Sequence, residues 1–140
     1  MIGDLHAGVD AHLTSASFQV SLTDPLRIVV RHDYDFDRLP ADIHSANGSG
    51  DIEISIDGGD WISANGYVVA GTSTFLGSSS GWRTDTLDFG TLLAGHALQF
   101  RWHAQIRPGY FEHFSHWAIA RVQVQGATTP LFSRMVADTN

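Results

Sequence analysis

Aspartates alternate with aromatic residues in the stretch RHDYDFD, which is the first candidate for chemistry in this sequence. Asp33, Asp35 and Asp37 are two residues apart, so in an extended strand their carboxylates share one face. Asp51 begins a second acidic stretch and could face them from an opposite strand. Ca²⁺ takes oxygen ligands of this kind, but a solvated strand face also tolerates such charges because water screens them. Two interpretations follow: a calcium site with these four carboxylates as ligands, or a solvated outer face.

Histidine is the second candidate, since the chain has eight histidines and no cysteine. The stretch HFSHW places His113 and His116 three residues apart, and His103 lies on the preceding predicted strand. A zinc site of these ligands is conceivable, but residues three apart in an extended segment point to opposite faces. Four others lie in predicted loops or at strand ends: His6, His12, His44 and His96. Structural and surface roles are therefore favoured for the histidines.

Patterns for covalent or acid–base catalysis are weak. There is no cysteine, and no strand–turn–helix elbow surrounds a Gly-x-Ser-x-Gly run. Glycoside hydrolysis would need both glutamates of the chain, Glu53 and Glu112, as its carboxylate pair, and each lies in a segment with a simpler structural role. We predict that this domain is not an enzyme, and a small stand-alone hydrolase remains the alternative.

Composition excludes some partners. The 140 residues carry a net charge of −7, and all eight basic residues are arginines spread singly along the chain. No basic stripe is available for phosphates, so nucleic acid and anionic membrane surfaces are disfavoured. No apolar run approaches the ~20 residues of a membrane span.

The length predicts a single domain over residues 1–140. The N-terminal stretch MIGDLHAGVDAH lacks the charged and apolar regions of a signal peptide. Met1 followed at once by domain-like sequence fits a piece cut from a longer protein, so we expect targeting information to lie outside this chain.

Short segments of alternating polarity must position these residues. In LQFRWHAQI, for example, Leu98, Phe100 and Trp102 face one way while Arg101 and His103 face the other. Such segments recur between Gly, Ser, Asn, Asp and Pro clusters, which is typical of an antiparallel sandwich or barrel. The predicted strands are His12–Val20, Leu26–Phe36, Gly50–Ile56, Gly66–Ala70, Trp82–Asp88, Ala97–Ile106 and Trp117–Gln125, with a further candidate at Leu131–Val136. The predicted core is Phe18, Leu26, Ile28, Val30, Ile54, Leu87, Phe100, Trp102, Trp117 and Val122.

Loop aromatics are the candidates for binding. RPGYFEHFSHW opens with turn residues, so at least one of Tyr110 and Phe111 is expected to be exposed, beside His113. The Gly- and Ser-rich stretch Gly71–Gly81 offers Phe75, and Tyr67 is a further edge aromatic. We predict that these side chains form the interaction surface; the alternative is that the rings fold back and cap the sandwich.

Four segments together carry a resemblance to a known family: LRIVVRHDYDFD, GDIEISIDGGDW, GSSSGWRTDTLDFGTLLAGHALQFRWHA and HWAIARVQV. From about Leu13 to Val124 their order and spacing resemble the MAM-like domains near the C-termini of secreted bacterial peptidases of the immune inhibitor A and fungalysin types. The family's last strand ends in paired aspartates, where this chain has Ala120 and Arg121. That departure weakens the calcium interpretation, so we expect no cofactor, with Ca²⁺ as the possible exception.

The resemblance implies an all-β fold, an antiparallel jelly-roll β-sandwich that is galactose-binding-like or MAM-like. It also implies a non-catalytic accessory domain of a secreted or cell-surface bacterial protein, attached to a peptidase. Such a domain would contact a protein, a glycan or a neighbouring domain of the same chain, and a carbohydrate-binding module is an alternative. IDGG (Ile56–Gly59) should be a hairpin turn, since Asp57-Gly58 suits a type I′ turn. Glu53 and His32 match family positions on paired strands and are expected to be neighbours.

Overall fold

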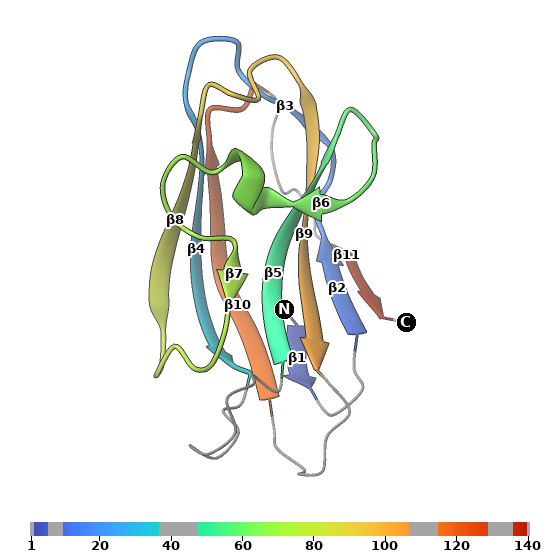
Figure 1. Cartoon of the computed structure of the whole chain (residues 1–140), viewed down its shortest axis with the longest axis vertical. Helices are drawn as coiled ribbons and strands as arrows, with labels where there is room; N and C mark the ends of the chain where they lie inside the picture. Colours follow the sequence, from blue (N-terminus) through green and yellow to red (C-terminus); the bar gives the residue numbers. More distant parts are fainter. Residues whose placement is uncertain (1, 6–9, 37–47, 107–114, 129–135, 140) are drawn as a thin grey trace.

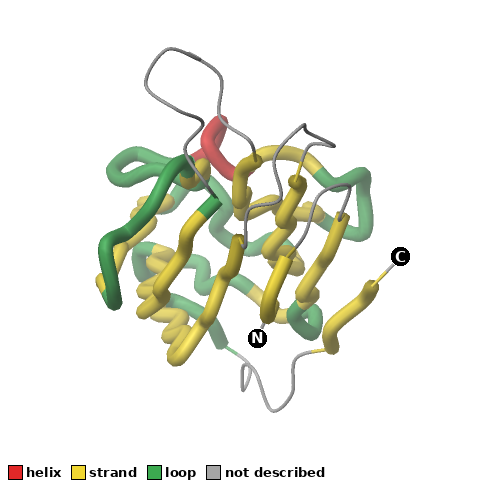
Figure 2. Tube along the Cα trace, turned by 90° about the horizontal axis from the view of Figure 1, so that it is seen from below, coloured by secondary structure: helices red, strands yellow, loops and turns green. Residues whose placement is uncertain are grey.

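Two antiparallel sheets, each formed from segments distant in sequence, pack face to face in the computed structural model (Figures 1 and 2). The structure describes residues 2–5, 10–36, 48–106, 115–128 and 136–139. Sheet A has the order β1 (Ile2–Leu5), β10 (Ser115–Gln125), β4 (Leu26–Asp35) and β8 (Arg83–Gly90). Sheet B has the order β11 (Val136–Thr139), β2 (Asp10–Thr14), β9 (Ala97–Ile106), β5 (Gly48–Ile56) and β6 (Ile62–Ser63). Two short strands complete sheet B: β3 (Phe18–Gln19) pairs with β9, and β7 (Thr74–Phe75) pairs with β5. The all-β sandwich predicted from the alternating segments is confirmed.

The core lies between the sheets and follows the alternation of the sequence. In β4, Leu26, Ile28 and Val30 are buried, while Arg27 and Arg31 are exposed on the outer face. Of the ten predicted core residues, nine are buried, and Val122 is partly buried against the same cluster.

Several predicted boundaries change. Gly66–Ala70 is not a strand, because the chain forms a 3₁₀ turn, η1 (Ala64–Tyr67), capped by the Ser63 hydroxyl, which accepts from the Asn65 N–H. The expected loop Gly71–Gly81 contains β7. Residues 131–135 of the last predicted strand lie outside the described ranges, and β11 begins at Val136. Within the part of the chain that is described, no helix has the length and apolar character to cross a membrane.

The β5–β6 connection confirms the predicted hairpin turn. Asp57 and Gly58 have φ angles of 52° and 75°, the positive values that a type I′ turn requires at both central positions. The Gly59 N–H donates to the Ile56 carbonyl at 2.9 Å and closes the turn. The Asp57 side chain reaches the next strand, where Oδ1 accepts from the Ala97 N–H at 2.9 Å.

An aromatic cluster fills one half of the core, and Gly50 makes room for it. His32, Tyr34 and Phe36 all point inward from β4 and its end, and Trp117 of β10 packs edge-on against Phe36 with 5.5 Å between ring centroids. Gly50 lies on the inner face of β5 opposite these rings. A Cβ on Gly50 would stand 2.5 Å from Phe36 Cζ and 2.8 Å from Trp117 Cζ3.

Gly50→Ala is therefore expected to lower the free energy of unfolding by about 1–3 kcal/mol, because neither ring can move without disturbing the core. Gly66→Ala is the matched control, since a Cβ there meets nothing within 4 Å. Urea denaturation of both variants checks this expectation. Equal midpoints for the two variants would show that the aromatic cluster yields to an added methyl group.

Candidate functional site

The outer face of sheet B carries a connected group of ionisable side chains, which we call the outer cluster: Asp10, His12, Glu53, Arg101 and His103. Strand pairing creates it. His12 of β2 lies directly opposite His103 of β9, and Arg101 lies opposite Glu53 of β5. All of these positions alternate with buried residues on their strands, so the side chains point away from the core.

His103 is the centre of the cluster, because each of its ring nitrogens faces a carboxylate. Nδ1 lies 2.7 Å from Glu53 Oε1, and Nε2 lies 2.6 Å from Asp10 Oδ1. His103 and Glu53 are largely buried, whereas the Asp10 side chain is 51% exposed. The imidazole is thus held in one orientation between a largely buried carboxylate and an exposed one.

Arg101 fixes the Glu53 carboxylate from the other side. Its Nη2 and Nε donate to Glu53 Oε1 at 3.0 and 3.2 Å, the same oxygen that His103 contacts. The Arg101 guanidinium also lies over the ring of Trp61, with Cζ 4.6 Å from the ring centroid. Trp61, just past the hairpin turn, therefore borders the cluster and is itself half-buried.

His12 stacks on His103, with 4.1 Å between ring centroids, and its Nε2 lies 3.6 Å from Asp10 Oδ1. Burial lowers the pKa of His12, and the nearby His103 and Arg101 lower it further. A neutral imidazole is the form that binds metals. Asp10, His12 and His103 each offer one ligand atom, and these atoms lie within 4.8 Å of one another.

A second histidine network, formed by His32, Trp117 and Asp85, lies in the core and joins its strands by hydrogen bonds. Trp117 Nε1 donates to His32 Nδ1 at 3.1 Å, so the His32 proton must sit on Nε2, which lies 2.7 Å from Asp85 Oδ2. Burial lowers the pKa of His32 and outweighs the opposing effect of Asp85. Burial acts to raise the pKa of Asp85, but hydrogen bonds from His32 and Arg83 outweigh it and lower that pKa.

The predicted grouping of four calcium ligands is wrong. Asp33 and Asp35 share the outer face of sheet A, where Asp33 accepts from the Ser79 hydroxyl and lies 3.1 Å from His116 Nε2. Asp51 points outward from sheet B, on the opposite side of the sandwich, so it cannot join them. Asp37 lies outside the described residues. Of the four residues in the calcium hypothesis, Asp33 and Asp35 are the two that the structure describes on one face.

Two further expectations for single residues are wrong. His32 and Glu53 are not neighbours, because His32 points into the core from sheet A and Glu53 points outward from sheet B. Phe75 is not an exposed loop aromatic, since it is buried and packs edge-on against His32 with 4.8 Å between centroids. Short pairing of β7 with β5 draws it inward.

The remaining predicted binding residues have mixed outcomes. Tyr67 is partly buried and packs against the core. Tyr110, Phe111 and His113 lie outside the described residues, as does Glu112. Sequence reasoning missed the outer cluster because it placed His12 at a strand end and looked for the partners of His103 in HFSHW. The available signal was the spacing of Asp10 and His12, which puts both side chains on one strand face.

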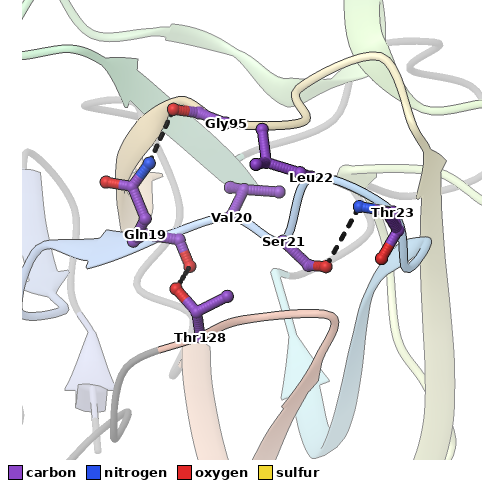
Figure 3. A pocket seen from close by; sticks show the side chains of 7 residues that line it. All are labelled: Gln19, Val20, Ser21, Leu22, Thr23, Gly95 and Thr128. Carbon is purple, nitrogen blue, oxygen red and sulfur yellow. Dashed lines mark hydrogen bonds between the residues drawn. The ribbon is translucent and has the colours of Figure 1, made fainter.

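A shallow recess lies close to the start of β9, between the β3–β4 connection and Gly95 (Figure 3). Its lining is Gln19, Val20, Ser21, Leu22, Thr23, Gly95 and Thr128. Gln19 Nε2 donates to the Gly95 carbonyl at 2.6 Å, and the Ser21 hydroxyl accepts from the Thr23 N–H at 3.2 Å. These polar groups tie the loops together, and none of the described lining residues carries a charge.

No protein-family model matches the chain, and no curated protein matches it significantly. The function must therefore be inferred from the fold and from the outer cluster.

Proposed function

We propose that this chain is a non-catalytic accessory domain of a secreted or cell-surface bacterial protein, attached to a peptidase. Its ligand is a glycan or a protein, and the outer face of sheet B is the contact surface. The outer cluster is the observation that carries this proposal. Glu53, Arg101 and His103 hold one another in fixed positions on an outer face, which is the preorganisation that recognition of a polar ligand needs.

We further infer that the sandwich is a jelly roll, as the MAM-like resemblance implies. The support is a nested series of antiparallel pairs: β5 with β6, β4 with β8, β2 with β9, and β1 with β10. A long hairpin folded over on itself produces this series, and the chain then passes between the two sheets as it does here.

A glycan is the ligand class that Trp61 favours. An indole ring bordering an array of hydrogen-bonding groups offers the apolar face of a sugar a surface to stack on, while the polar groups bind its hydroxyls. Arg101 already holds the ring in place, so little side-chain freedom is lost on binding. The carbohydrate-binding alternative is thus one form of the accessory-domain proposal.

We expect Trp61→Ala to weaken binding on an immobilised oligosaccharide array, or to the neighbouring domain of the same protein, by about 10-fold or more. Trp82→Ala is the matched control. Trp82 also lies beside an arginine, with Arg31 Cζ 5.8 Å from the centroid of its ring. Arg31, however, belongs to the outer face of sheet A. Binding that survives Trp61→Ala, or that Trp82→Ala removes instead, would contradict the assigned surface.

A panel of chromogenic glycoside and peptide substrates tests the hydrolase alternative. We expect no turnover above the uncatalysed rate. Turnover that Glu53→Gln abolishes would overturn the non-catalytic proposal. Of the two glutamates in the sequence, Glu53 is the one that lies within the described residues.

A further inference from the structure

We propose that Asp10, His12 and His103 form a binding site for Zn²⁺ on the outer face of sheet B. The inference does not rest on the proposed binding function, because metal binding is measured on the domain without any glycan or protein partner.

The positions of the ligand atoms are close to those that zinc requires. Tetrahedral Zn²⁺ with bonds of about 2.0–2.2 Å keeps its ligand atoms roughly 3.3–3.6 Å apart. Asp10 Oδ1 and His12 Nε2 are already 3.6 Å apart, and Asp10 Oδ1 and His103 Nε2 are 2.6 Å apart. A metal would have to open the second distance, and it would also have to bring the ligand atoms of His12 and His103, which lie within 4.8 Å of each other, to tetrahedral spacing. Asp10 can supply the first movement, because it begins β2 and its side chain is 51% exposed.

Glu53 prepares His103 for this role. A histidine that ligates a metal through one nitrogen commonly donates from the other to a carboxylate, which fixes the ring and strengthens the ligand. Glu53 Oε1 lies 2.7 Å from His103 Nδ1, so Nε2, which lies 2.6 Å from Asp10 Oδ1, is the nitrogen that would bind the metal in place of its direct contact with Asp10. Arg101 in turn holds Glu53 through the same oxygen. Glu53 and Arg101 are not among the three proposed ligands, so their contacts are a separate observation in favour of the site.

The ligand set selects the kind of metal. Two imidazoles and one carboxylate suit Zn²⁺ and related transition metals, whereas Ca²⁺ takes oxygen ligands alone. Three protein ligands leave a fourth zinc position for water or for a group of a bound molecule. The site is also separate from Asp33 and Asp35, which lie on the other sheet.

Isothermal titration of the 140-residue chain with ZnCl₂ tests the proposal. We expect one Zn²⁺ per chain through this site. His12→Ala and His103→Ala should each weaken it by at least about 100-fold, and Glu53→Gln by about 10–100-fold. His96→Ala is the matched control, because His96 also contacts a carboxylate, Asp57, at 2.6 Å, but forms part of no three-ligand group among the described residues. The zinc affinity of His96→Ala should stay within about 3-fold of that of the parent chain.

Unchanged zinc affinity in His12→Ala and His103→Ala would overturn the proposal, as would an equal loss in His96→Ala. Circular dichroism checks that each variant is folded. If His103→Ala does not fold, His12→Ala and Glu53→Gln decide, since neither removes the ring held at the centre of the cluster. Co²⁺ provides a second readout: its visible absorption should report a four-coordinate site in the parent chain and lose that signature in His12→Ala. Loss of zinc binding with intact glycan or protein binding would leave the proposed function standing.

Discussion

Trp102→Ala is expected to lower the free energy of unfolding by about 3–5 kcal/mol, because it removes an indole ring from a fully buried position. Trp102 lies at the middle of β9, which pairs with β2 on one side and β5 on the other. The inner faces of both neighbours contribute to the same core, with Leu13 and Ile52 directly opposite the indole. Neither strand can close the cavity without breaking its pairing with β9.

Thermal and urea denaturation measure this effect, and we expect the melting temperature to fall by roughly 10 °C or more. Trp82→Ala removes the same atoms from a residue that is 48% exposed and should cost less than about 1 kcal/mol. Similar losses for the two variants would mean that Trp102 does not occupy the core as described.

His32→Leu is expected to cost about 3 kcal/mol at pH 8, because it leaves polar partners without hydrogen bonds in the core. The Trp117 N–H loses its acceptor, and among the described residues Asp85 keeps its contact with Arg83, at 2.6 Å. Adding Trp117→Phe removes the stranded donor, so the double variant should lose less than the sum of the two single variants. Strict additivity in this double-mutant cycle would contradict the hydrogen bond between His32 and Trp117.

The same network predicts how stability depends on pH. Burial lowers the pKa of His32 in the folded chain, so below pH ~6.5 the unfolded chain binds a proton that the folded chain does not. Stability should therefore fall as the pH drops from about 6.5, by at most about 1.4 kcal/mol per pH unit for this group. His12, whose pKa is also lowered, acts in the same direction. Asp85, with a lowered pKa, adds its loss only below pH ~3.8. His32→Leu should flatten the slope between pH 6.5 and 5 in urea titrations, and an unchanged slope would contradict this assignment.

The sequence alone was sufficient to predict the sandwich and the inner face of each long strand. Alternation in LRIVVRHDYDF places Leu26 to Phe36 correctly with respect to the core, because side chains two residues apart on a strand share a face. The Asp57-Gly58 turn was equally predictable, since positive φ at both positions is a local preference. Both properties depend on residues close together along the chain, although the same kind of local pattern wrongly predicted a strand at Gly66–Ala70.

Only the tertiary structure decided which faces meet. The acidic residues Asp33 and Asp51 looked like partners, but β4 and β5 belong to different sheets, so their outward side chains lie on opposite sides of the sandwich. Phe75 sits in a Gly- and Ser-rich loop by composition, yet two residues of pairing with β5 bury it. His12 and His103 become neighbours because β2 pairs with β9 in one register. Strand pairing depends on contacts across the whole chain, and local periodicity carries no information about which strand will lie alongside another.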